Sequence, residues 1–184
     1  MNERSMYASA MGEASFARLS PAVQGLHRLS GKHVLQGWVE TDAPAGWLAG
    51  LLALCLGSPR AASAGPLRFE LDARPEIETW IRGFPTRTMR SQLRLKPGLI
   101  EEKLGASRLL FRLTDLADGG LRMELLHLRF FGLPCPRVLT PKIIAEETGD
   151  GDRFNFRVSA TVPGIGRVAS YRGYLQLRPE AQRS

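Results

Sequence analysis

The chain has 184 residues, of which 43% are hydrophobic and 23% are charged, and its formal net charge is +7. This length suits a single domain with a substantial core, and the ordinary composition argues against disorder along the whole chain. Two cysteines, Cys55 and Cys135, are too few for a disulfide scaffold and do not have the spacing of a structural zinc site, so we expect free thiols and no metal.

The charge and the apolar segments bear on location and partners. The N-terminal residues are not followed by the apolar stretch of a secretory signal, and the longest apolar run, Trp47–Leu56, is shorter than the ~20 residues that cross a bilayer. We therefore expect a cytoplasmic protein without a transmembrane segment. The positive net charge would suit an anionic partner, but charges of both signs alternate along most of the chain, as on the solvent-exposed face of a sheet.

In chain order, the first elements are helical. Apolar residues recur every three or four positions over residues 5–30, with a break at Ser20-Pro21, where Pro21 suits a first helical position. His33–Glu40 is rich in β-branched and aromatic residues and predicts a strand. The next helix, starting near Asp42-Ala43-Pro44 and running to about Leu56, is apolar nearly all round. Such a helix must be buried on most sides or lie against a membrane.

From Pro66 onward the period changes to two. Leu67, Phe69 and Leu71 alternate with charged residues, and similar alternation recurs over residues 89–96, 109–113, 153–160 and 171–178. Glycine- and proline-containing turns separate these runs, and Gly132–Pro136 predicts a rigid crossover or an edge. We predict one α+β, mostly β domain over residues 1–184. In it, a curved antiparallel meander, a half-barrel or a barrel, wraps around the apolar helix and carries N-terminal helices.

Three side chains are weak candidates for catalysis. Glu101 and Glu102 are adjacent in a strand and therefore point to opposite faces. If Leu99 faces inward, Glu101 does too, and a carboxyl group in an apolar interior has a raised pKa and can transfer protons. His127 could complete such a site, although an ordinary ion pair of the carboxylates with Lys103 explains them equally well.

The segment from Trp80 to Lys96 is the most distinctive candidate for binding. It contains Arg82, Arg90 and Arg94 and no acidic residue, so basic side chains are interleaved with aromatic ones. The alternation places Arg90 and Arg94 on the wet face of one strand, which favours an anionic small molecule over nucleic acid. No glycine-rich phosphate loop is present, so we expect no nucleotide cofactor.

Segments over nearly the whole chain also carry a family likeness. They are Phe16–Leu19 with Leu26-His27, Leu48–Gly57, Trp80–Phe84, Leu99–Glu102, Gly132–Pro136, Phe154–Phe156 and Val168–Leu175. In these segments the chain resembles a bacterial domain of unknown function that occurs alone or fused behind saccharopine-dehydrogenase-like, NAD(P)-binding Rossmann domains. The resemblance implies an accessory partner of an oxidoreductase and assigns no catalytic, binding or cofactor residues.

Three functions follow from these patterns. The first is a non-enzymatic binding domain for an apolar or lipid-like molecule with an anionic group, with Trp80, Arg82, Arg90 and Arg94 as ligand-binding residues. The second is an interaction module that docks onto an NAD(P)-dependent oxidoreductase through an exposed apolar patch at Phe130, Phe131 and Leu133. The third is an enzyme that uses Glu101 or Glu102 with His127, which requires these side chains to converge in one cleft.

Overall fold

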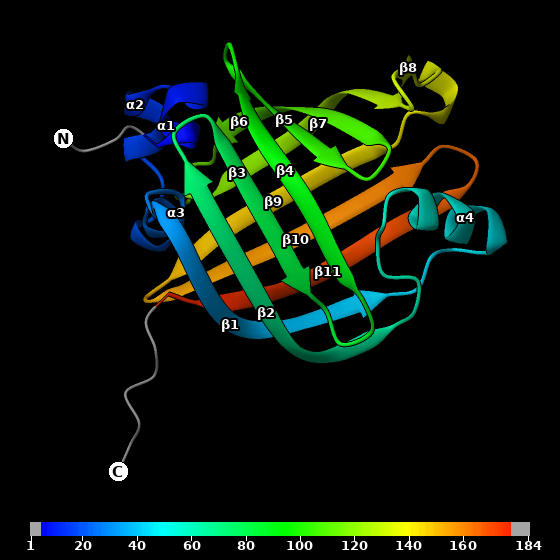
Figure 1. Cartoon of the computed structure of the whole chain (residues 1–184), viewed down its shortest axis with the longest axis horizontal. Coiled ribbons are helices and arrows are strands. Elements are labelled where there is room, and N and C mark those ends of the chain that lie inside the picture. The colour runs from blue at the N-terminus through cyan, green and yellow to red at the C-terminus, as the bar shows by residue number, and fades with distance from the viewer. Residues whose placement is uncertain (1–4, 178–184) are drawn as a thin grey trace.

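A closed barrel of ten antiparallel strands dominates the computed structural model, which describes residues 5–177 (Figure 1). The elements are α1 (Met6–Met11), α2 (Glu13–Ala17), α3 (Pro21–His27), β1 (Gly31–Asp42), α4 (Trp47–Cys55), β2 (Ser63–Arg74), β3 (Ile77–Gly83), β4 (Thr88–Lys96), β5 (Leu99–Leu104), β6 (Ser107–Asp115), β7 (Leu121–Phe130), β8 (Leu133–Pro134), the 3-10 helix η1 (Arg137–Leu139), β9 (Lys142–Asp150), β10 (Arg153–Val162) and β11 (Gly166–Gln176).

The strand order closes into a ring. Around the barrel the order is β6-β5-β4-β3-β2-β1-β11-β10-β9-β7, and β7 pairs again with β6. The short β8 pairs only with the end of β7 and lies outside the ring, which agrees with an edge at Gly132–Pro136. The pairing of β7 with β9 covers Leu121–Glu124, and beyond it β7 turns toward β8. Closure removes the free edges of a mostly hairpin-connected sheet.

Alternation along the strands sorts side chains between the interior and the outer wall. On β2, Leu67, Phe69 and Leu71 are buried and the residues between them are more exposed. On β4, Met89 and Leu93 are buried inside, while Arg90 and Arg94 are exposed. The mostly β, antiparallel architecture predicted from the period of two is therefore confirmed.

Two glycines bring the first and last barrel strands unusually close together. A Cβ atom at Gly37 would lie 1.8 Å from the carbonyl oxygen of Tyr174, and one at Gly173 would lie 2.0 Å from that of Trp38. These positions are diagonal neighbours in the β1–β11 ladder, where Gly37 pairs with Leu175 and Gly173 pairs with Val39. Any larger residue at either position would push the two strands apart, so glycine is needed for this part of the wall.

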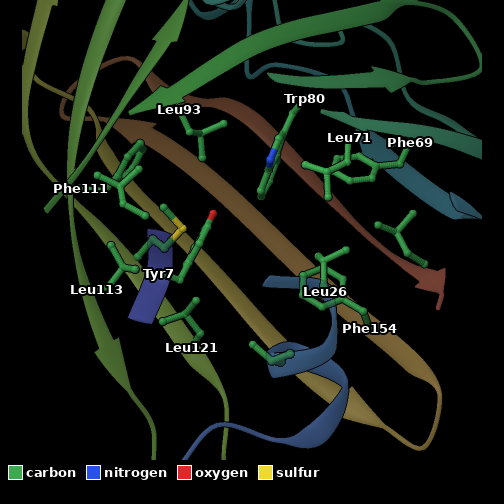
Figure 2. Close-up of a cluster of buried hydrophobic side chains, with 14 of the residues drawn as sticks. Tyr7, Leu26, Phe69, Leu71, Trp80, Leu93, Phe111, Leu113, Leu121 and Phe154 are labelled. Atoms are coloured by element: carbon green, nitrogen blue, oxygen red, sulfur yellow. The ribbon is translucent and has the colours of Figure 1, made fainter. Parts of the chain in front are cut away.

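Helices α1, α2 and α3 fill one end of the barrel (Figure 1). Tyr7 and Val23 are fully buried and Phe16 is nearly so, and all three belong to the main core. Figure 2 shows the ring of Tyr7 among side chains from the barrel wall, with its hydroxyl directed into the interior. The interior is thus occupied from this end by N-terminal residues, and Ser5 ties the start of α1 to α3 by donating its hydroxyl proton to the carbonyl of His27 at 2.5 Å.

The apolar helix α4 is not inside the barrel, so this part of the predicted fold is wrong. It lies at the opposite end from α1–α3 (Figure 1). Only Ala49 and Ala53 are buried, against Val162 and Val168, whereas Trp47 is 78% exposed. The interior has no room for α4, because α1 and the inward-facing strand residues already fill it. Within residues 5–177, no helix combines the length and the apolar character that crossing a membrane requires.

Candidate functional site

The barrel encloses an apolar cavity of about 120 Å³. Aliphatic and aromatic side chains from many strands form its wall, and several of them are drawn in Figure 2. A dry engineered cavity of about 150 Å³ binds benzene, so this space suits a molecule of about that size. The wall includes Leu67, Phe69, Leu93, Phe111, Met123, Phe154 and Leu175.

One strand, β3, brings polar groups to this wall. Glu78, Trp80 and Arg82 are two positions apart and share the inward face of the strand. The indole Nε1–H of Trp80 donates to Oε2 of Glu78 at 2.8 Å, and the guanidinium carbon of Arg82 lies 4.8 Å from the centre of a Trp80 ring. Trp80 therefore bridges an acidic and a basic group inside the barrel, and both Trp80 and Arg82 line the cavity.

Arg82 donates hydrogen bonds to two neighbouring side chains. Its Nη1 lies 3.2 Å from the hydroxyl of Ser91 and 3.5 Å from Oε1 of Glu102. The side chains of Arg82 and Glu102 are only 13% and 14% exposed, so the pair is partly shielded from water. Burial by itself lowers the pKa of Arg82, but Tyr171 and Glu102 outweigh it and hold this pKa above its usual value. A fixed positive charge therefore sits at the cavity wall.

Near these groups, α1 and α3 place a second polar cluster. The ring of Tyr7 stacks on the imidazole of His27 at a centroid distance of 3.6 Å, and Nε2 of His27 lies 2.6 Å from Oε2 of Glu147 on β9. The Tyr7 hydroxyl lines the cavity side of this cluster and, among residues 5–177, has no hydrogen-bond partner. A buried hydroxyl without a partner is unusual, and here it leaves a hydrogen-bond donor on the cavity side.

Burial shifts the proton affinities of the interior groups. It raises the pKa of Tyr7 well above its ordinary value, with a further contribution from Glu147, and it raises the pKa of Tyr171. Burial also raises the pKa of Glu78, although His27 and the hydrogen bond from Trp80 act in the opposite direction. Both tyrosines are therefore neutral hydroxyl groups at neutral pH, able to donate a hydrogen bond to an anion.

The other residues singled out from the sequence lie outside this interior. Arg90 and Arg94 are exposed on the outer face of β4, away from the cavity. Glu101 also faces outward and lies within 3.8 Å of Lys96 and 3.6 Å of Arg108, because the inward position next to it is occupied by Ile100. The condition under which Glu101 would be the inward carboxylate is therefore not met, and Glu102 takes that place.

His127 does not meet the interior carboxylate. It is exposed on β7, whereas Glu102 points into the barrel, so these two side chains lie on opposite faces of the wall. Glu101 shares the outer face with His127, but Leu110 lies between them, since Glu101 pairs with Leu110 and Leu110 pairs with His127. The convergence in one cleft that catalysis by these residues requires is not present.

Four interior polar residues were not foreseen as site residues: Tyr7, His27, Glu78 and Glu147. The period-two rule already places Glu78 on the same face as Trp80 and Arg82, and the helical spacing places His27 on the buried stripe with Val23. Tyr7 and Glu147 come from distant segments, and their meeting with His27 depends on the three-dimensional fold. Within the described part of the chain, no three His, Cys, Asp or Glu side chains are gathered as metal ligands.

The fold and the cavity define a ten-stranded antiparallel barrel with an apolar interior and a few buried polar groups. The chain belongs to the family described as domain of unknown function DUF4166, which matches residues 19–175. Among solved structures it is similar to Rv2717c from M. tuberculosis, with a TM-score of 0.47 and 14% sequence identity over 88% of this chain and 99% of that chain. No curated protein matches it.

Proposed function

We propose that this protein binds a small apolar or aromatic molecule with an anionic group, most simply a carboxylate, inside the barrel. The cavity wall is mainly hydrocarbon and would hold the apolar body of the ligand. The single observation that carries the proposal is the guanidinium of Arg82 at this wall, which would hold the anionic group.

Arg82 has unused capacity to bind an anion. A guanidinium has five N–H donors, and both of its hydrogen bonds within residues 5–177 leave from Nη1. The distance of 3.5 Å to Glu102 is long for a charge-assisted hydrogen bond, so a ligand carboxylate could form a shorter one. The unpartnered Tyr7 hydroxyl supplies a second donor on the cavity side.

Glu102 makes the proposal testable, because it competes with the ligand. Its carboxylate is the acidic partner of Arg82, and it would repel an incoming anion. Replacing Glu102 by glutamine removes this repulsion and leaves Arg82 in place. An anionic ligand should then bind more tightly, whereas a cationic ligand that used Glu102 as its anchor would bind more weakly.

The test compares three small aromatic probes of similar size: 4-fluorobenzoate, 4-fluorobenzyl alcohol and 4-fluorobenzylamine. Fluorine NMR titration gives the affinity of each for the purified protein. We expect the benzoate to bind about tenfold or more tightly than the alcohol, as a charge-assisted hydrogen bond predicts. We expect Arg82→Met to remove this preference and Glu102→Gln to increase it.

Arg90→Met is the matched control, since it removes the same charge from the outer face of the neighbouring strand. It should leave all three affinities unchanged, as should Arg94→Met. Two results would overturn the proposal: an affinity order led by the amine, or an equal loss of benzoate binding in Arg82→Met and Arg90→Met. Thermal unfolding of each variant confirms that the barrel has folded.

A further inference from the structure

Large apolar side chains that are exposed to solvent gather at one end of the barrel. Single exposed residues of this kind are normal, but a cluster marks an interaction surface. Eight of the ten that the described residues contain lie in α4 or in residues 131–139, and we call these two segments the apolar end surface. Its members are Trp47, Leu48, Leu51, Leu54, Phe131, Leu133, Val138 and Leu139.

The two segments face each other across an apolar groove. The groove has a volume of about 520 Å³, with Leu48, Leu51 and Leu52 of α4 on one side and Phe130 and Leu133 of the β7–β8 hairpin among the residues on the other. Both segments lie at the end of the barrel opposite α1–α3 (Figure 1). Leu56 lines this groove as well as the interior cavity, so the surface adjoins the proposed binding site.

The turn of the β7–β8 hairpin contains an aromatic residue whose backbone conformation is unfavourable for a bulky side chain. Phe131 and Gly132 form its two-residue turn, and both have positive φ angles, 49° and 80°. Such a turn favours Asn, Asp or Gly at both positions, and a bulky side chain there is a genuine outlier. The ring of Phe131 meets that of Phe130 edge-on at a centroid distance of 4.6 Å, yet Phe131 remains 77% exposed. Local rules are broken in this way mainly at functional positions.

The charge of the connecting segments identifies the chemistry of the partner. At the end that carries α4, the connections are residues 43–62, 84–87, 105–106, 131–141 and 163–165, which contain Arg60, Arg87 and Arg137 and no acidic residue. The hairpin turns at the other end, 75–76, 97–98, 116–120 and 151–152, contain Glu76, Asp118 and Asp152 and no basic residue. The apolar end surface is therefore flanked by positive charge.

We propose that the apolar end surface docks onto an anionic lipid bilayer. Helix α4 would lie in the plane of the interface with Leu51 and Leu54 toward the acyl chains, and Trp47 would sit at headgroup level, where tryptophan is enriched. The arginines would contact anionic headgroups. An all-apolar helix must be buried within the protein or lie against a membrane. Most of α4 is not buried, so contact with a membrane is the alternative that remains.

A second copy of the chain is a poorer occupant. In a two-fold interface the same surface meets itself, which would bring the positively charged connections of the two copies together without acidic partners in these connections. An oxidoreductase, expected from the family resemblance, would use the same Phe131 and Leu133. Both occupants give results in the test that differ from membrane binding.

The test is co-sedimentation of the full chain with vesicles of phosphatidylglycerol and phosphatidylcholine, compared with vesicles of phosphatidylcholine alone. We expect binding to the anionic vesicles that weakens as salt rises above about 0.15 M, since the arginine contacts are screened. Leu51→Glu and Leu133→Glu should each lower the partition coefficient by about tenfold or more. Val34→Glu is the matched control: Val34 is 53% exposed on β1, outside the apolar end surface, and its substitution should have no effect.

Tryptophan fluorescence locates the contact. In a Trp38→Phe variant, Trp47 is the exposed tryptophan and Trp80 the buried one, so a blue shift and quenching by brominated lipids report on α4. The absence of vesicle binding would overturn the proposal, as would an equal loss in Val34→Glu. The proposal would also be overturned if sedimentation equilibrium showed a wild-type dimer that Leu51→Glu dissociates. A stoichiometric complex with an oxidoreductase, in the absence of vesicle binding, would overturn it as well. Because these readouts do not use the interior ligand, failure here leaves the Arg82 proposal standing, and the reverse also holds.

Discussion

The imidazole of His27 on α3 lies 2.6 Å from the carboxylate of Glu147 on β9, a residue 120 positions further along the chain. Both side chains are buried, at 1% and 7% exposure. The ring of Tyr7 covers the imidazole, so this pair fastens both α1 and α3 to the barrel wall. The polar pair thus fixes how the N-terminal helices close their end of the cavity.

Removing one member of this pair should destabilise the protein more than removing both. His27→Leu leaves the Glu147 carboxylate buried without its partner, and we expect a loss of about 3 kcal/mol in the free energy of unfolding. Adding Glu147→Met should restore part of this loss. Urea unfolding of the wild type, both single variants and the double variant measures the coupling, and purely additive losses would contradict it.

Glu78 should make stability depend on pH. Its pKa is raised in the folded protein, mainly by burial, from an ordinary value of 4.5. The associated stability is complete below the unfolded-state pKa and is lost as the pH rises through the folded-state pKa, because the buried group must then ionise. Glu78→Gln keeps an acceptor for Trp80 and removes this loss, so it should gain stability relative to the wild type as the pH rises from 4.5 to neutrality. Urea unfolding across this range checks it, and a constant difference would contradict it.

Tyr7→Phe should stabilise the ligand-free protein. The hydroxyl of Tyr7 is buried without a hydrogen-bond partner among residues 5–177, so its removal relieves a desolvation cost and should gain about 1 kcal/mol. The same change should weaken binding of 4-fluorobenzoate. Tyr174→Phe on the outer wall is the control and should alter neither quantity, while a destabilised Tyr7→Phe variant would show that the hydroxyl has a partner in solution.

The strands were predictable where apolar side chains occupy the inward-facing positions. The alternation around Leu67 and Phe69 directly gives the two faces of β2, and residues 89–96 do the same for β4. In β3 the pattern is reversed, since Glu78 and Arg82 face inward while Ile77 and Ile81 lie at the alternate positions. A rule that places apolar residues inside cannot find a polar interior site of this kind.

The position of α4 was not predictable from its composition. An all-apolar helix implies burial in a soluble domain, yet the interior volume was already taken by Tyr7 and other N-terminal residues. The helical spacing predicts a buried stripe in this segment but does not place it inside the barrel. Similarly, the assignment of Glu101 or Glu102 to the interior depends on a register shift of one residue, and the full burial of Ile100 decides it. Which segments occupy the barrel interior depends on the whole chain, so a short stretch of sequence does not predict it.

Enlarging the cavity should change which ligands fit. Leu93 is 1% exposed and lines the cavity, so Leu93→Ala should lower the free energy of unfolding by about 3 kcal/mol and leave extra space in the cavity. A fluoronaphthoate should then gain affinity relative to 4-fluorobenzoate, because the larger ring fills the new volume. Val23→Ala is the control, since Val23 is fully buried in the core and does not line the cavity. It should destabilise the protein without changing the ratio of the two affinities, and a similar change of that ratio in both variants would mean that the probes bind elsewhere.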